Sequence, residues 1–406
     1  MVTYRTLFSF GEFRYLFGGQ LLSNLGDQVA GVAVAVLVFD RTGSALLSAV
    51  AYASAWLPGI VGGPILATYA DRLPRRTVMV VCDLSRAALM ALLIAPGVPL
   101  GVSIALLYVA HLVSPPFVAA RAALMPDVLP GEAYVTGNGL TNIASQFSQL
   151  VGFVAGGVVV AAIGPTWAVL GNAATFALSA LAIAVGVRHR PAAASSGGLL
   201  VQARDGMRYL LADPWLRTCL ALVWIASGFS FAPEAIAYPW AVSLGGGPAQ
   251  AGLLLAAPCV GFLAGAVVLT RLLPPDTRNL LLVPAAVLST AALIPVLFAR
   301  SLPAVLVLLV VGGAGAAFNA PLNAVFVRRV APQYRGRAMG IASSGLLVCQ
   351  GVGFLLAGTA AQMGLDPAVV VGLAGTLGTF AVLATATAWR RAEATDDHLA
   401  PRVETG

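Results

Sequence analysis

Residues 71–76 read DRLPRR, and they lie between two long apolar runs, AYASAWLPGIVGGPILATYA at 51–70 and TVMVVCDLSRAALMALLIA at 77–95. The whole chain has the same character. Of its 406 residues, 59% are hydrophobic and 10% are charged, whereas a soluble domain has about a quarter charged residues. The composition therefore predicts an all-α integral membrane protein, in which DRLPRR forms a short polar loop between two membrane-spanning helices.

Apolar runs of about 20 residues predict membrane-spanning helices, and this chain has room for twelve of them. The first run is too long for the apolar part of a secretory signal, so we expect it to remain as a span. The predicted spans are 15–39, 44–69, 78–96, 99–120, 138–163, 167–187, 216–243, 250–273, 280–299, 304–327, 338–363 and 368–389.

The basic residues are all arginine, and lysine is absent. A nucleotide-binding P-loop needs a lysine, so ATP hydrolysis by that route is excluded, and we expect neither enzyme activity nor a cofactor. The four cysteines lie in apolar runs without metal-type spacing, and we expect no metal site. The arginines are dispersed between the spans, so the net charge of +7 indicates membrane topology rather than nucleic-acid binding.

The distribution of arginine predicts the orientation in the membrane. With the N-terminus in the cytoplasm, all the arginines except Arg41 and Arg300 fall at or near cytoplasmic ends of spans. Cytoplasmic loops carry such an excess of positive charge. We therefore expect a multi-pass protein of the cell membrane with both termini in the cytoplasm.

The longest polar stretch, RHRPAAASSGGLLVQARDGMRYLLADPW, separates the sixth and seventh spans. QLVGFVAGG at 149–157 is echoed by QGVGFLLAG at 350–358, in line with a parallel internal repeat. Such repeats place a substrate site near the midplane between the halves. The predicted divisions are a six-helix half at 1–187, a cytoplasmic linker with an amphipathic helix at 188–215, a second half at 216–389, and a cytoplasmic tail at 390–406.

The loop ATYADRLPRR at 67–76 resembles the loop motif of the major facilitator superfamily, roughly Gly-x-x-x-Asp-Arg-x-Gly-Arg-Arg. Ala67 and Pro74 stand where the motif has glycine. Three further stretches resemble the macrolide-efflux-like branch of the drug:proton antiporters. They are FRYLFGGQLLSNLGDQVAGVAVAVLVFDRTGS, PPFVAARAALMPDVLPGE and QYRGRAMGIASS. The resemblance implies the major facilitator fold and proton-coupled export. The matching charged residues are Asp71, Arg72, Arg75 and Arg76.

The resemblance implies that these four residues form a cytoplasmic latch that favours the outward-facing state. Asp71 would lie at the positively polarised N-terminal end of span 11. The arginines can bind carboxylates or carbonyls at neighbouring helix ends. The alternative is that the loop only anchors the topology, which accounts for the arginines but not for Asp71.

VGFVAGG at 151–157 resembles the antiporter motif Gly-Pro-x-x-Gly-Gly, with Phe153 in place of proline. Gly152, Gly156 and Gly157 match the motif, and small residues of this kind let membrane helices approach closely. The resemblance implies export rather than uptake.

Asp27 lies near the middle of the first span, where a charge costs about 2.5–3.5 kcal/mol to insert. Gln20, Asn24 and Gln28 fall on the same helical face, which predicts that this face lines a wet cavity or contacts another span. We expect Asp27 to couple transport to protons. The alternative is a neutral Asp27 that is hydrogen-bonded to Asn24 or Gln28.

A second candidate is Glu234, which shares an aromatic stripe in the seventh span with Trp224, Phe231 and Tyr238. A carboxylate among aromatic rings suits a lipophilic amine, and Glu234 can also take part in proton coupling. The alternative is that the stripe faces lipid, with Glu234 reaching outward. Nearby prolines predict a local break in this helix.

Other polar residues either line the cavity or join helices. His111 is a candidate proton relay or a helix–helix hydrogen-bond partner. Asp83 and Arg86 are three residues apart and are expected to pair locally. No arginine is expected at mid-span, and Asp40 receives no role. The remaining cavity candidates are Asn142, Gln146, Gln149, Asn319 and Asn323.

These features predict a monomeric, proton-coupled exporter of amphipathic, cationic or neutral small molecules that works by alternating access. One alternative is a dedicated exporter of a single metabolite, such as a siderophore or a self-made antibiotic. An uptake symporter and a non-transporting membrane sensor or scaffold are further alternatives.

Overall fold

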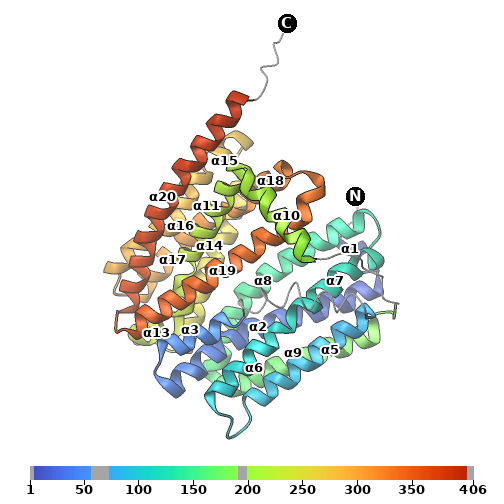
Figure 1. Cartoon of the computed structure of the whole chain (residues 1–406). Helices are drawn as coiled ribbons and strands as arrows, with labels where there is room; N and C mark the ends of the chain where they lie inside the picture. Colours follow the sequence, from blue (N-terminus) through green and yellow to red (C-terminus); the bar gives the residue numbers. More distant parts are fainter. Residues whose placement is uncertain (1–3, 56–72, 191–198, 400–406) are drawn as a thin grey trace. The chain divides into compact units, whose positions relative to one another are not determined.

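The computed structural model describes residues 4–55, 73–190 and 199–399, and these ranges are almost entirely helical, with no strand among them (Figure 1). Within them, ten helical stretches are long and apolar enough to cross a membrane. They are Gly11–Thr42, Leu100–Val128, Glu132–Ile163, Pro165–Gly186, Pro214–Ala235, Pro248–Leu272, Thr277–Phe298, Leu302–Arg329, Pro332–Gln362 and Pro367–Arg391.

Two of the twelve predicted spans are not among these ten. The span predicted at 44–69 begins with α3 (Ala45–Ala53), but most of its remainder lies outside the described residues. The span predicted at 78–96 corresponds to α5 (Arg75–Leu93). This helix is less apolar than the others because it carries Arg75, Arg76, Asp83 and Arg86.

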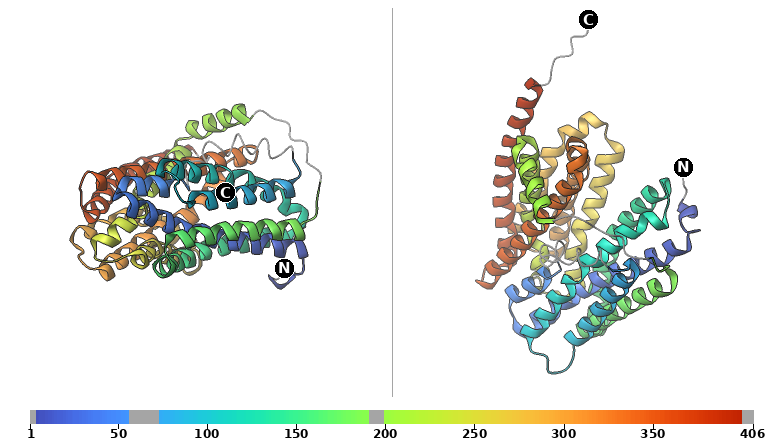
Figure 2. Two further views of the ribbon diagram at one scale, coloured as in Figure 1. Left: turned by 90° about the horizontal axis from the view of Figure 1, so that it is seen from below. Right: turned by 45° about the vertical axis from the view of Figure 1, so that its right-hand side comes forward.

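The chain divides into two compact units, of which the first comprises Met1–Gly197, Glu234–Cys259 and Gly358–Gly364. Its N-terminal part holds α1 (Tyr4–Leu7), α2 (Gly11–Thr42), α3, α5, α6 (Leu100–Leu112), α7 (Ser114–Val128), α8 (Glu132–Ile163) and α9 (Pro165–Gly186). Helix α2 packs against both α8 and α9, and α5 packs against α9 (Figures 1 and 2).

Glycines permit close helix packing in this unit. A Cβ atom added to Gly156 of α8 would lie 3.0 Å from the Cα atom of Val29 in α2. At Gly157 a Cβ atom would lie 3.0 Å from the Cα atom of Gly252 in α14 (Pro248–Val267). The expectation that the glycines of VGFVAGG let helices approach is confirmed. Gly156 allows close packing of α8 against α2, and Gly157 allows close packing of α8 against α14.

The second unit comprises Gly198–Pro233, Val260–Ala357 and Leu365–Gly406. It holds α10 (Leu199–Ala212), α11 (Pro214–Ser230), α15 (Pro275–Leu280), α16 (Leu282–Ala291), α17 (Leu302–Ala316), α18 (Asn319–Arg329), most of α19 (Arg335–Gln362), and α20 (Pro367–Leu399). Its buried core joins α11, α16, α18 and α20 through residues that include Leu216, Ala286, Phe326 and Trp389. Helix α10 lies where the linker helix is predicted, while the predicted division at 188–215 stays a prediction.

The seventh predicted span is not one continuous helix. Helix α11 ends at Ser230, and two short helices follow, α12 (Ala232–Ala235) and α13 (Ala237–Ser243). Pro233 and Pro239 lie in these short helices, and proline cannot supply the backbone N–H that a helix interior needs. The predicted local break is confirmed.

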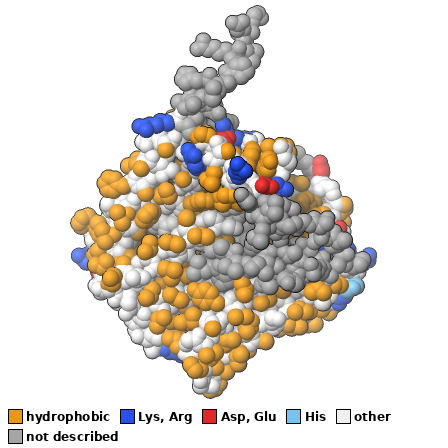
Figure 3. Space-filling view, in the orientation of Figure 1, with side chains coloured by type: hydrophobic (Ala, Val, Ile, Leu, Met, Phe, Trp, Pro, Cys, Tyr) orange, Lys and Arg blue, Asp and Glu red, His pale blue; other side chains and the backbone are white. Residues whose placement is uncertain are grey.

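The surface of the described residues is rich in exposed hydrophobic side chains. Val185, Leu280, Phe298 and Phe380 are each at least 70% exposed. Figure 3 shows hydrophobic side chains spread over the left and lower parts of the displayed face. Such a surface suits contact with lipid, and together with the long apolar helices it shows a multi-pass membrane protein.

Candidate functional site

The only mid-helix carboxylate of α2 forms a buried ion pair with α5. The Arg86 Nη2 atom donates hydrogen bonds to both carboxylate oxygens of Asp27, at 2.9 Å and 3.1 Å. The Arg86 side chain is 5% exposed and the Asp27 side chain is 28% exposed. Asp27 therefore holds a guanidinium that has almost no access to solvent.

Helix α9 completes the surroundings of this pair. The Asn172 Nδ2 atom lies 3.4 Å from Asp27 Oδ1, and the guanidinium carbon of Arg86 lies 3.9 Å from the centre of the Phe176 ring. Gly26 makes this approach possible, because a side chain there would collide with Asn172 and Thr175. An amide and an aromatic face thus stabilise opposite members of the pair.

This geometry corrects two expectations from the sequence. Arg86 pairs with Asp27 rather than with Asp83, so the expected local pair of α5 is wrong. Arg86 also lies in the interior of α5, which corresponds to the span predicted at 78–96, where no arginine was expected. The signal that was missed is the presence of opposite charges near the middle of two different apolar runs, since charges inside a membrane are usually paired.

Two more titratable residues lie near the ion pair. Asp83 is completely buried one turn before Arg86 in α5, and neither of its oxygens makes a hydrogen bond with the described residues. His111 interacts electrostatically with both Arg86 and Asp27, and its Nδ1 atom lies 2.9 Å from the carbonyl oxygen of Leu107. We call Asp27, Asp83, Arg86 and His111 the buried charge cluster.

The polar stripe of α2 makes contact with α8. Gln20 donates to the Asn24 side chain at 3.1 Å, and Asn24 donates to the Ser145 hydroxyl at 2.9 Å. Neither Asn24 nor Gln28 is hydrogen-bonded to Asp27 among the described contacts, so the neutral alternative for Asp27 is not what the structure shows. Of the candidates on α8, Asn142 and Gln146 are exposed and Gln149 is half-buried.

Glu234 is only 6% exposed and accepts a hydrogen bond of 3.0 Å from the hydroxyl of Tyr52 in α3. The alternative in which Glu234 reaches outward is therefore wrong. Tyr238 of α13 donates a hydrogen bond of 2.8 Å to Asp40 of α2, a residue to which the sequence gave us no reason to assign a role. Two tyrosine–carboxylate pairs thus lie in the first unit.

The predicted aromatic stripe does not form one helical face. Phe231 ends α11 and Tyr238 belongs to α13, so the regular helical spacing is interrupted between them. Trp224 of α11 donates a hydrogen bond of 3.0 Å to the carbonyl of Ala342. In α18, the Asn319 side chain donates to the carbonyl of Ala316 at 3.2 Å, and Asn323 is exposed.

Of the four latch residues, Asp71 and Arg72 lie outside the described residues. The Arg75 Nη1 atom lies 2.7 Å from Asp127 Oδ2, and it also donates to the carbonyl of Ala123. Arg76 donates to the carbonyl of Ala184 near the end of α9. The two arginines therefore join the start of α5 to the ends of α7 and α9, which are the kinds of contact expected of them.

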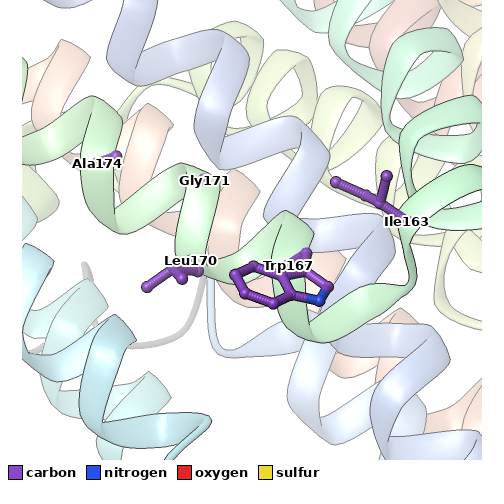
Figure 4. A pocket seen from close by; sticks show the side chains of 5 residues that line it. All are labelled: Ile163, Trp167, Leu170, Gly171 and Ala174. Carbon is purple, nitrogen blue, oxygen red and sulfur yellow. The ribbon is translucent and has the colours of Figure 1, made fainter.

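An apolar groove lies at the junction of α8 and α9 (Figure 4). Trp167 and Leu170 of α9 and Ile163 at the end of α8 line it, and Trp167 is 63% exposed. An exposed tryptophan near a helix end is typical of the membrane–water interface. Titratable side chains are absent from its lining, and it is separate from the buried charge cluster.

Comparison with known proteins identifies relatives that match more than four fifths of the chain. The family model described as Major Facilitator Superfamily matches residues 16–273 and 220–404. The multidrug efflux pump Tap of Mycolicibacterium fortuitum is 28% identical over 358 residues, which cover 84% of this chain and 87% of that protein. The multidrug efflux pump Tap of Mycobacterium tuberculosis is 27% identical over 357 residues, which cover 83% of this chain and 84% of that protein.

Solved structures show the same arrangement of helices. The nucleoside transporter NupG has a TM-score of 0.72 at 12% identity, with 93% of this chain and 99% of that chain covered. An inward-facing, occupied bacterial homologue of the lysosomal transporter Spinster has a TM-score of 0.68 at 16% identity, with 94% of each chain covered. At such identities the likeness concerns the fold.

Proposed function

Because the chain belongs to the major facilitator superfamily, we propose that it is a proton-coupled exporter of amphipathic small molecules that works by alternating access. Its similarity to proteins named as multidrug efflux pumps supports export of drug-like compounds. We also propose that both termini lie in the cytoplasm and that residues 71–76 act as the cytoplasmic latch.

The observation that carries this proposal is the ion pair between Asp27 and Arg86 inside two membrane helices. A buried ion pair contributes little to stability, because the loss of hydration offsets most of the attraction between the charges. Intramembrane ionisable residues more often mark proton pathways. Protonation of Asp27 removes its charge and releases Arg86, so one proton can change the packing of α2 against α5.

The buried groups favour cationic or neutral substrates. Asp27 already neutralises Arg86, so this guanidinium is not free to bind an anion. Glu234 is a carboxylate beside the aromatic side chain of Tyr52, and both properties suit a lipophilic cation. These features support a drug exporter over a dedicated exporter of an anionic siderophore.

The test uses the purified protein in liposomes with an imposed pH gradient. We expect a lipophilic cation with a permanent charge, which cannot cross as a neutral base, to accumulate in the acidic compartment, and substrate addition to cause proton movement in the opposite direction. Accumulation that is unaffected by the pH gradient would contradict proton coupling, and movement of substrate in the same direction as protons would indicate a symporter. Activity on one compound within a chemically varied panel would favour the dedicated metabolite exporter.

A further inference from the structure

We propose that Asp83 holds the coupling proton in the state described here, and that Arg86 exchanges Asp27 for Asp83 as its partner when that proton moves. This inference rests on the proposed proton coupling and deepens it. In place of Asp27 as the single titrating residue, it assigns the coupling to two carboxylates, Asp27 and Asp83, which share the guanidinium of Arg86 and one proton.

The charges of the cluster require one proton. Asp27 and Asp83 together carry two negative charges when ionised, and Arg86 carries one positive charge, so one added proton makes the three residues neutral. Asp27 receives two hydrogen bonds from Arg86 and is therefore the ionised member. Asp83 is 0% exposed and neither oxygen is hydrogen-bonded to the described residues, a position in which an ionised carboxylate is very costly. The proton is accordingly placed on Asp83.

The geometry of Arg86 permits the exchange. Only its Nη2 atom binds Asp27, while its Nε atom is buried and makes no hydrogen bond with the described residues. Asp83 lies three positions earlier in α5, and side chains three apart on a helix are neighbours. The flat face of Phe176 lies against the guanidinium and stabilises its charge without fixing which carboxylate it binds.

The step is a simple proton transfer. The O–H bond on Asp83 breaks, an O–H bond forms on Asp27, and Arg86 keeps all its protons. The guanidinium then follows the negative charge to Asp83. Because Asp27 is 28% exposed and Asp83 is fully buried, the proton moves from an enclosed site to one from which water can remove it.

Other groups around the cluster leave this charge count unchanged. The groups facing Asp83 and Arg86 are Asp27 from α2, His111 from α6 and Cys82 from α5, and α9 contributes Asn172, Phe176 and Ser179. The thiol of Cys82 adds no charge, and His111 is counted as neutral because the positive charge of Arg86 nearby disfavours a second one. The buried hydroxyl of Ser179 lies beside Asp83 and has no hydrogen-bond partner among the described residues. A small rotation of the side chain would let its oxygen accept a hydrogen bond from the protonated carboxyl group of Asp83.

The first experiment measures coupling and substrate movement separately in liposomes. Asp83→Asn is expected to lose pH-driven accumulation by at least tenfold, while exchange of substrate without a gradient stays within about twofold of wild type. Loss of both activities would mean that Asp83 is structural and would overturn the inference. Asp366→Asn, which removes a carboxylate at the start of α20 outside the cluster, is the matched control.

The second experiment locates the proton by infrared spectroscopy. In a Glu234→Gln background, the band of a protonated carboxyl group should be present, should shift on Asp83→Glu, and should stay unchanged on Asp27→Glu, because both variants keep the charges of the cluster. The opposite pattern would place the proton on Asp27 and overturn the inference while leaving the proposed function intact. Substrate accumulation by the wild-type protein that does not respond to the pH gradient would instead contradict the proposed function itself.

Discussion

The hydroxyl of Tyr52 donates a hydrogen bond of 3.0 Å to Glu234, joining α3 to the short helix α12 in the first unit. Both side chains are buried, at 6% exposure each. A carboxylate in this position is available to a substrate only if the neighbouring helices move. The pair is therefore suited to a site that opens during transport.

Glu234→Gln should weaken export of a lipophilic amine far more than export of a neutral hydrophobe of similar size. The electrostatic contribution is lost while apolar contact survives, and such a contact contributes about 0.5–2 kcal/mol, or several-fold to about thirtyfold in affinity. Transport assays with the two compounds measure this directly. Tyr52→Phe is the matched control, since it removes the hydroxyl and keeps the carboxylate. Equal wild-type activity of Glu234→Gln on both compounds would count against the assignment.

Asp27→Asn should abolish proton-driven export, because the neutral amide can neither take up a proton nor alternate between binding a proton and binding Arg86. It should also lower thermal stability, but by less than the roughly 3–5 kcal/mol that an unpaired buried charge costs, because Asp83 can release its proton and pair with Arg86. The double variant Asp27→Asn/Arg86→Gln separates the two effects. We expect it to recover most of the melting temperature in detergent while export stays absent. Normal coupled export by either variant would rule out Asp27 as the coupling residue.

The latch can be tested at two of its four positions. Asp71→Asn and Arg75→Gln should slow transport without changing which compounds are recognised, because a cytoplasmic latch would lie away from a midplane substrate site. Arg75→Gln removes a partly exposed ion pair with Asp127, so stability should fall by no more than about 1 kcal/mol. Rates across a compound panel provide the measurement. A changed compound profile at an unchanged rate would contradict the latch.

The sequence predicted the membrane class, the fold and the break near Pro233, because these depend on apolar run length and on the missing N–H of proline. It also singled out Asp27, since a charge inside an apolar run is conspicuous. The partners of these residues could not be predicted. Arg86 lies 59 residues from Asp27 along the chain, and Tyr52 lies 182 residues from Glu234. Such pairs depend on tertiary packing, and a local rule paired Arg86 with Asp83 instead.

Gly157→Ala should destabilise the protein, because α8 and α14 approach each other at this point. The added Cβ atom would lie 2.7 Å from the carbonyl oxygen of Pro248 and 3.0 Å from the Cα atom of Gly252, and backbone atoms cannot move aside as a flexible side chain can. Overpacking of this kind costs about 1–3 kcal/mol. Gly139→Ala in the same helix is the control, since nothing lies within 4 Å of its added Cβ atom. Alanine favours a helix over glycine by about 0.5–1 kcal/mol, so this control should be neutral or slightly stabilised. Thermal unfolding in detergent compares the two variants. Equal melting temperatures would contradict the close contact between α8 and α14.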